Sequence, residues 1–369
     1  MARLAVCSSL KVQAHKNKTR SGMKELNAHP AGYERKYAVS LIVAVVSCLC
    51  VLFGCDSANK DASTAVAPQP LYQDPVYDGA ADPSIVWDKQ GRRWLMFYTN
   101  RRANVVGLQG VEWVHGTPIS IATSKNGRER DYLQDAQFNG NGVTETLWAP
   151  DVFVHNDQYH MYLTMVQGIF DNWSHPRTIA HFTSADLLTW TYQSTLKLNT
   201  EKVIDADVIA KPDGGFRLFY NDEPDGKSIY FADSEDLYDW QDKGKAALSS
   251  RGEGPVVFYW QGWYWMVVDA WRGLSVYRSA DLDSWQQQSG YLLSEPGKGE
   301  QDGVIGQHPD VVVQDGRAFL FYFTHPGKIP SNEGTDDART RRSVIQVTEL
   351  EFDGQWLQTD RDQPVTIDW

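Results

Sequence analysis

Residues 253–271 read EGPVVFYWQGWYWMVVDAW: an apolar run, a tight polar turn and a second run rich in aromatic side chains. Apolar and aromatic runs on either side of a glycine turn are typical of a β-hairpin. The same plan recurs four times elsewhere in the chain. The other copies are ADPSIVWDKQGRRWLMFYTN (81–100), APDVFVHNDQYHMYLT (149–164), DADVIAKPDGGFRLFYND (205–222) and HPDVVVQDGRAFLFYFTH (308–325).

A second element follows each hairpin, and in three copies its end is almost identical: TSADLLTW (183–190), ADSEDLYDW (232–240) and RSADLDSW (278–285). Successive copies begin about 50 to 70 residues apart, which suits a four-stranded propeller blade with its loops. A β-sandwich or a stack of hairpins would also contain short aromatic strands, but the whole two-part unit repeats here. The sequence therefore predicts an all-β fold, a five-bladed β-propeller with four-stranded blades.

Composition and charge limit the classes of function. The chain has 369 residues, of which 42% are hydrophobic, so it can bury its own core. Residues 56–369 carry 27 basic and 45 acidic side chains, a net charge of -18, whereas the whole chain carries -12. Such a charge repels phosphate backbones, so no nucleic-acid partner is expected. All four cysteines lie at or before residue 55, which excludes disulfides and cysteine-bound metals from the rest of the chain.

The amino-terminal segment has the plan of a secretory signal. Arg35 and Lys36 precede an apolar run at 38–54, and a polar stretch follows Cys55. The residues LFGC (52–55) resemble the lipobox of bacterial lipoproteins, which implies lipidation of Cys55; an uncleaved signal anchor is the alternative. We expect a signal and lipoprotein segment at 1–55, a flexible tether at 56–75 and a catalytic propeller at 76–369. The protein would lie in the bacterial cell envelope, in the periplasm or at the cell surface, lipid-anchored or secreted.

One position of the repeat concentrates titratable side chains. Alignment of the five copies places Asp82, Ala149, Asp205, Glu253 and His308 at the same point of the first strand. In a propeller this strand lines the central channel, so these positions would form a ring around its mouth. Crowded carboxylates raise at least one carboxyl pKa, and glycosidic bond cleavage needs one protonated and one ionised carboxyl. Asp207 competes with Asp205 as the third carboxylate of the site.

The second strand of each hairpin would return to the same mouth, and its end would carry sugar-binding groups. Arginine and asparagine can hydrogen-bond vicinal hydroxyls, and a tryptophan offers a flat face to a sugar ring. Including the rim of the mouth, the predicted substrate-binding residues are Asn100, Arg101, Trp148, Asp151, Glu223, Trp271, Arg272, His308 and His325.

These residues resemble family 43 of the glycoside hydrolases over about residues 75–330. The motifs are Asp82-Pro83, Asp205, Glu253-Gly254-Pro255 and the Trp-Ala-Pro-Asp of residues 148–151. The resemblance implies an inverting enzyme in which Asp82 is the general base, Glu253 the general acid and Asp205 the residue that orients the acid. Inversion implies a separation of roughly 6.5 to 9.5 Å between base and acid. Many relatives have proline where this chain has Ala206.

The resemblance also implies a ligand and a substrate class. His308 matches a histidine that lies near a central cation in relatives, so a central Ca²⁺ is an expectation, although no cofactor is required. The pieces TNRR (99–102), VHG (114–116), VIDAD (203–207) and FTHPG (323–327) resemble a branch that removes terminal α-L-arabinofuranosyl or β-D-galactofuranosyl residues. The long insert at 101–148 could close one side of the mouth. The expected partner is an oligo- or polysaccharide, and the expected state is a monomer.

Other functions stay open from the sequence. A β-xylosidase, an agar-oligosaccharide hydrolase or a glycoside phosphorylase would share the fold, and Arg101, Arg102 and Arg272 could bind the phosphate that a phosphorylase needs. A non-catalytic sugar-binding propeller on the cell surface is a further alternative. The chain contains no HExxH, GxxxxGK[ST], GxSxG or paired CxxC motif, which argues against other common enzyme classes.

Overall fold

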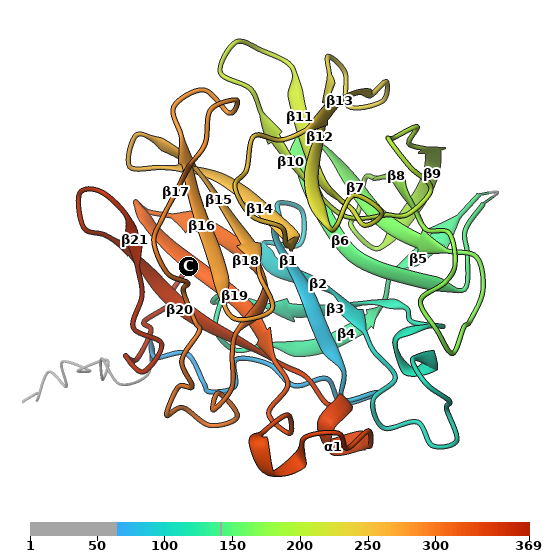
Figure 1. The fold of residues 1–369 in the computed structure, drawn as a ribbon, viewed down its shortest axis with the longest axis vertical. Helices are drawn as coiled ribbons and strands as arrows, with labels where there is room; N and C mark the ends of the chain where they lie inside the picture. Colours follow the sequence, from blue (N-terminus) through green and yellow to red (C-terminus); the bar gives the residue numbers. More distant parts are fainter. Residues whose placement is uncertain (1–64, 141) are drawn as a thin grey trace, which may run out of the picture. The chain divides into compact units, whose positions relative to one another are not determined.

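A computed structural model describes residues 65–369 except residue 141, and it confirms the five-bladed β-propeller. Five sheets follow one another along the chain and stand around a common axis (Figure 1), and the four strands of each blade pair antiparallel. The first three blades consist of β1 (Ala80–Asp88), β2 (Arg93–Asn100), β3 (Ile119–Ser124) and β4 (Asp131–Asp135); β6 (Thr146–His155), β7 (Gln158–Val166), β8 (Thr178–Ser184) and β9 (Thr189–Thr195); and β10 (Val203–Ala210), β11 (Phe216–Asp222), β12 (Ser228–Ser234) and β13 (Gln241–Lys245). The last two consist of β14 (Glu253–Trp260), β15 (Trp263–Asp269), β16 (Leu274–Ser279) and β17 (Gln286–Gln287); and β18 (Gln307–Gln314), β19 (Arg317–Thr324), β20 (Val344–Phe352) and β21 (Leu357–Gln358).

The first strand of each blade is the innermost one. These strands contact one another in the cyclic order β1, β6, β10, β14, β18 and back to β1, which closes the ring. We call the end of the axis where they begin the mouth, and the end where they turn into the second strands the lower face. The second blade carries a fifth strand, β5 (Gln137–Asn139), which pairs in parallel with β9.

The core lies between the blades. Alternate residues of each second strand face the two adjacent blades. In the first blade, Met96 and Tyr98 pack on Phe321 of the fifth blade, whereas Phe97 packs on Met161 of the second blade. Similar buried clusters fill the other three interfaces. Strands buried on both faces explain why the second strands read as nearly continuous apolar runs rather than as an alternating pattern.

The repeated Asp-Leu motif forms the turn between third and fourth strands. In the second blade the Asp186 side chain accepts hydrogen bonds from the backbone N–H groups of Leu188 and Thr189, each at 2.8 Å. Leu187 has a φ of 65° and is fully buried, and the indole of Trp190 is buried beside it in the same cluster. Aspartate side chains often stabilise turns by accepting hydrogen bonds from the N–H groups of the same turn. The repeated Asp-Leu motif therefore identifies a local turn.

The stretch predicted as a tether is shorter than expected, because residues 65–75 pack on the propeller. Ala67 and Tyr72 form backbone hydrogen bonds with Val365 and Ile345, and Leu71 is buried. The signal segment 1–55 lies outside the described residues. The few helical turns, η2 (Glu112–Val114), η3 (Pro330–Asn332) and α1 (Ala338–Arg341), lie in loops that follow second strands. Within the described part of the chain, no helix is long and apolar enough to span a membrane.

Candidate active site

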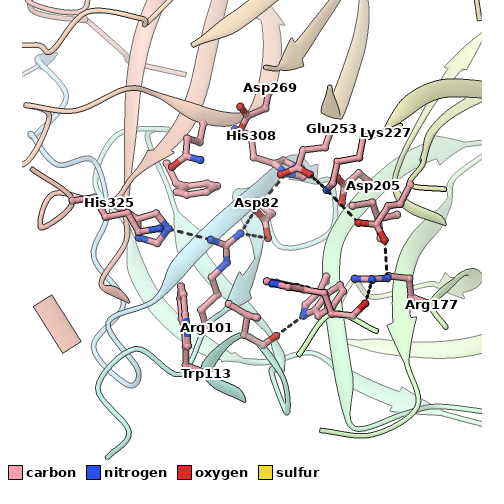
Figure 2. A pocket seen from close by; sticks show the side chains of 18 residues that line it. Asp82, Arg101, Trp113, Arg177, Asp205, Lys227, Glu253, Asp269, His308 and His325 are labelled. Atoms are coloured by element: carbon pink, nitrogen blue, oxygen red, sulfur yellow. Dashed lines mark hydrogen bonds and ion pairs between the residues drawn. The ribbon is translucent and has the colours of Figure 1, made fainter. Parts of the chain in front are cut away.

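A cavity of about 470 Å³ opens at the mouth, and side chains from all five blades line it (Figure 2). The three predicted catalytic carboxylates, Asp82, Asp205 and Glu253, all belong to this lining. They come from the first, third and fourth blades, so acids far apart in the sequence meet in one opening.

A bulge at the mouth end of each innermost strand presents these residues. The pairing register shifts at the same point of all five strands, for example between Ala81 and Ser84 in β1. One residue of each bulge has left-handed backbone dihedrals, and a bulge re-aims the side chain that it carries. The five residues with their φ angles are Asp82 (52°), Ala149 (45°), Asp205 (59°), Gly254 (55°) and His308 (38°).

The predicted ring is therefore wrong at one member, because Gly254 and not Glu253 occupies the fourth position. Glu253 precedes the bulge and aligns with Trp148, and its side chain is 24% exposed against 5% for Asp82. A Cβ atom on Gly254 would lie 2.8 Å from Nδ1 of His308, so the ring has no room for a side chain there. Glu253 consequently reaches the cavity from just outside the ring.

Asp82 is a buried carboxylate held between two cationic groups. Arg101 donates to both carboxylate oxygens from one nitrogen, at 2.9 and 3.2 Å, and Nδ1 of His308 lies 3.4 Å away. Burial alone would raise the pKa of Asp82, but the charges of Arg101 and His308 outweigh it and the pKa is lowered. An ionised carboxylate at this position has the charge that a general base requires.

Asp205 differs from Asp82 because, among the residues that the structure describes, no cation pairs with it directly. Its Oδ2 accepts the backbone N–H of Gly254 at 3.0 Å. Burial raises the pKa of Asp205 to about 7; Glu253 and Asp82 add to the rise and His308 opposes it. The raised pKa of Asp205 agrees with the expectation for a crowded carboxyl, but burial and not the neighbouring charges is its largest cause.

Glu253 belongs to an ion-pair chain along one wall of the cavity. Lys227 lies 2.6 Å from Glu253 and 3.2 Å from Glu223, and Arg177 lies 2.8 Å from Glu223. Burial would lower the pKa of Lys227, but Glu253 and Glu223 outweigh this and raise it. The ammonium of Lys227 thus stays charged beside the predicted general acid and fixes one of its oxygens.

Asp151 and Asp207 do not line the cavity. Both lie beyond the bulge, where they accept backbone N–H groups of the next blade: Asp151 from Val208 at 3.0 Å and Asp207 from Val257 at 2.9 Å. The equivalent Asp310 binds Ile85 of the first blade. These side chains link neighbouring blades, so the prediction of Asp151 as substrate-binding is wrong, and Asp207 does not compete with Asp205.

Comparison with known proteins addresses the family. The model of the "Glycosyl hydrolases family 43" matches residues 123–272, which span most of the second, third and fourth blades. This match confirms the resemblance that the motifs indicate. Over this segment, which is 150 of the 369 residues, the chain matches the family 43 glycoside hydrolases.

Solved structures support the five-bladed fold of this chain. A thermostable family-43 glycoside hydrolase is 18% identical with a TM-score of 0.59, and the alignment covers 78% of this chain and 95% of that one. An exo-1,5-α-L-arabinanase from a bovine ruminal metagenomic library is 15% identical with a TM-score of 0.54, covering 76% and 97%. An exo-β-1,3-galactanase from Phanerochaete chrysosporium is 14% identical with a TM-score of 0.57, covering 80% and 66%. No curated protein matches the sequence.

Most of the predicted sugar-binding residues line the cavity. Those present are Arg101, Trp148, Glu223, His308 and His325. They come from four of the five blades, as expected if the second strands return to the mouth.

Three other predicted residues lie outside the cavity lining. Asn100 is fully buried and donates to Ser120 within its blade. Trp271 stands behind Lys227, whose ammonium is 5.4 Å from the indole ring centre, and Arg272 lies over the ring of Tyr291. Trp271 and Arg272 lie two and three residues past the end of β15 at Asp269, whereas Asn100 is the last residue of β2 and faces its own blade.

Several cavity residues were missed by the sequence analysis. They are Trp113, Trp173, Arg177, Lys227, Phe323 and Lys328, together with the smaller contributions of Val114, Ile204 and Gln307. Most lie in loops without a repeat pattern, so the sequence carried no signal for them. Asp269 ends a second strand and was a detectable position; its carboxylate accepts the N–H groups of Trp271 and His308, and burial raises its pKa to about 7.

The residues around His308 do not by themselves form a cation site. Nδ1 of His308 faces Asp82, and no group of three or more His, Cys, Asp or Glu side chains across residues 65–369 (residue 141 aside) is arranged to hold a metal ion. A cation at this point would therefore need water for most of its ligands.

Proposed function

We propose that this chain is an inverting, exo-acting hydrolase that removes terminal furanosyl residues from an oligo- or polysaccharide. The observation that carries the proposal is the convergence of Asp82, Asp205 and Glu253 in one sugar-sized cavity. The two carboxylates with reaction roles come from blades that are not adjacent, which leaves room for a water between them.

The proposed reaction uses one water and two proton transfers. Asp82 accepts a proton from a water whose oxygen attacks the anomeric carbon, while Glu253 gives its proton to the leaving glycosidic oxygen as that bond breaks. The contacts support Asp82 as the base, because Arg101 holds it. Glu253 is the more accessible of the two carboxyls, and to act as the acid it must take up its proton beside the charged ammonium of Lys227. Asp205 accepts the backbone N–H of Gly254, the residue after Glu253, so it can orient the backbone that carries the acid.

Exo action is supported by the way loops close one side of the mouth. The loop of the first blade and that of the second are joined by a 2.8 Å hydrogen bond between His115 and His175. Trp113, from the same insert, lies against His325 of the fifth blade with ring centres 6.0 Å apart. A mouth bridged in this way favours a pocket for a chain end over an open groove.

The furanosyl specificity rests on the short motifs TNRR, VHG, VIDAD and FTHPG. Each contributes a cavity residue: Arg101, Val114, Asp205 and His325 among them. The structural relatives include an arabinanase, a xylosidase and a galactanase, so xylosyl and galactosyl substrates belong in the same test.

Phosphorolysis fits the site less well than hydrolysis. Of the three arginines that could bind phosphate, Arg101 is engaged by Asp82, Arg102 donates to the carbonyl of Glu112, and Arg272 lies over Tyr291. A cationic pocket for phosphate would need these guanidinium groups free and turned to the same point.

The test is hydrolysis of aryl furanosides and pyranosides of arabinose, galactose and xylose, with NMR of the first anomer released. We expect release of arabinofuranose or galactofuranose with inverted configuration, independent of phosphate. Retention of configuration would show that the carboxylate roles are wrong, and turnover that requires phosphate would establish a phosphorylase. Binding without turnover of any substrate would establish a sugar-binding propeller.

Two further proposals concern ligand and location. We propose a water-coordinated Ca²⁺ near His308, tested by calcium analysis and by loss of activity on chelation.

We also propose that the chain is a monomer in the bacterial cell envelope, anchored by lipid on Cys55. Mass spectrometry of the mature amino terminus tests the anchor.

A further inference from the structure

The lower face of the propeller carries exposed apolar side chains at one repeated position. The sixth residue after the start of each bulge is Trp87, Val154, Ala210, Tyr259 or Val313 in the five blades. Four of them are among the large hydrophobic residues with the highest exposure, at 39%, 48%, 56% and 38% for Trp87, Val154, Tyr259 and Val313. Five innermost strands thus end in a ring of apolar residues around the axis, which we call the lower apolar ring.

Neighbouring members of the lower apolar ring share a hollow. Trp87 and Val154 both line a cavity of about 530 Å³ between the hairpins of the first and second blades. Lys89 and Asp157 form an ion pair at its edge. An apolar patch with a polar border is typical of an interaction surface rather than of scattered exposed residues.

The chain enters the propeller at this same face. Residues 65–67 pair with residues 365–367, and the carbonyl of Thr366 accepts a hydrogen bond from Arg317, the first residue after the lower turn of the fifth blade. From there the chain rises to Tyr72 and Gly79, which pair at the mouth end of β20. Val66, at the point of entry, is 39% exposed.

We infer that the lower apolar ring lies against the surface of the lipid bilayer that anchors the chain. The inference rests on the proposed anchor at Cys55 and not on the sugar specificity. Ala65 lies ten residues after Cys55, a stretch of chain that extends to at most about 35 Å. The tether therefore holds the face where the chain enters close to the membrane, and the catalytic mouth points away from it toward soluble substrate.

The chemistry of the ring fits a lipid interface better than a sugar. Trp and Tyr prefer the level of the lipid headgroups, and the valines add an aliphatic contact that sugar platforms do not use. The outer turns of this face carry Asp186, Asp236 and Asp281, so we expect contact with zwitterionic lipid and no gain from anionic lipid.

The experiment uses the absence of cysteine beyond residue 55. Val154→Cys on the lower ring and Val106→Cys on the mouth side, 91% exposed, are each introduced into the full chain with Cys7, Cys48 and Cys50 replaced by serine. An environment-sensitive fluorophore is attached to each, and the anchored proteins are placed in phosphatidylcholine vesicles with or without brominated lipid. Hydrolysis by both proteins verifies that they are folded.

We expect brominated lipid to reduce the emission of the Val154→Cys label about twofold and to leave the Val106→Cys label unchanged, because apolar faces enter the headgroup region. Adding Trp87→Ser and Tyr259→Ser should abolish the quenching at position 154.

If the protein floats with the vesicles but both labels respond alike, the anchor stands and the lipid contact is wrong. If it does not float, anchor and contact both fail. Emission that responds to oligosaccharide, or to protein concentration, instead of lipid would assign the ring to sugar or to a second copy and overturn the inference.

Discussion

Three cationic side chains of the active-site cavity are engaged by its carboxylates. Arg101 faces Asp82, Lys227 lies between Glu253 and Glu223, and Arg177 contacts Glu223. These ion pairs hold the hydrogen-bonding groups of the cavity in place before a sugar binds. Because the paired charges offset one another, the cavity suits a neutral sugar. The same pairing makes the charge of each carboxylate dependent on one identifiable partner.

Replacement of Glu253 by Gln tests the general acid. The amide cannot give a proton to the leaving oxygen, so we expect kcat/KM on a natural oligosaccharide to fall by about 10²- to 10⁴-fold. An aryl glycoside with an acidic phenol needs little protonation, and its turnover should fall much less. The two substrates are compared by initial rates. Equal losses on both would assign Glu253 to positioning, and no loss on either would remove it from the reaction.

Replacement of Arg101 by Met tests the general base through pH. Arg101 is one of the two charges that lower the pKa of Asp82, so its removal should raise that pKa. Since a base acts only when ionised, the acidic limb of the kcat/KM profile should move to higher pH. Arg102→Met is the matched control, because Arg102 bonds a loop carbonyl. An unmoved acidic limb in Arg101→Met would mean that Asp82 is not the base.

At the scale of the element, the bulge of the innermost strand determines which residues enter the site. The sequence showed five copies of the strand, and its ring positions were correct for Asp82, Asp205 and His308. It was wrong for Glu253 by one residue, because the position of a bulge depends on strand pairing that sequence similarity alone does not reveal. The proline that follows the bulge residue, Pro83 in β1 and Pro255 in β14, would have given the right alignment.

Gly254→Ala tests the requirement for an empty ring position. The residue has a φ of 55°, and the new methyl would meet His308 at 2.8 Å, so we expect a loss of stability of about 1–3 kcal/mol together with lower kcat. Gly262→Ala is the control, since its φ is 83° but no atom lies within 4 Å of the added Cβ. Urea unfolding and kcat separate the two effects. If both variants retain kcat equally, the crowding at His308 has no catalytic consequence.

At the scale of the whole molecule, the sequence predicted the architecture well and the loops poorly. The blades could be predicted because each one repeats the same pattern of strands and turns. The cavity walls could not, because Trp113 and Lys227 lie in unique loops whose positions depend on contacts with distant blades, such as that of Trp113 with His325. The fifth strand β5 was missed for a similar reason: three residues carry no period that identifies a strand.

Around the axis the blades are joined by buried carboxylates, and this has a consequence for stability. Burial raises the pKa of Asp151 to about 8, with Asp310 adding to the rise, and burial raises that of Asp310 to about 6. A carboxyl whose pKa is higher in the folded than in the unfolded state binds more protons when folded. Its contribution to the free energy of unfolding therefore grows as the pH falls from about 8 toward 4.

Asp151→Asn tests this linkage. The amide oxygen can still accept the N–H of Val208, which Asp151 accepts at 3.0 Å, but it does not have to ionise. We expect the variant to be more stable than the natural protein at pH 9, where the buried carboxyl is ionised at a cost, and to differ from it little near pH 4, where the folded carboxyl is protonated and about half of the unfolded carboxyls are. Thermal unfolding is measured at both pH values, with Asp213→Asn as control because that side chain is 78% exposed. A gain of equal size at both pH values would show that the Asp151 carboxyl does not change its protonation on folding, and a loss at pH 9 would show that its charge stabilises the contact between the second and third blades.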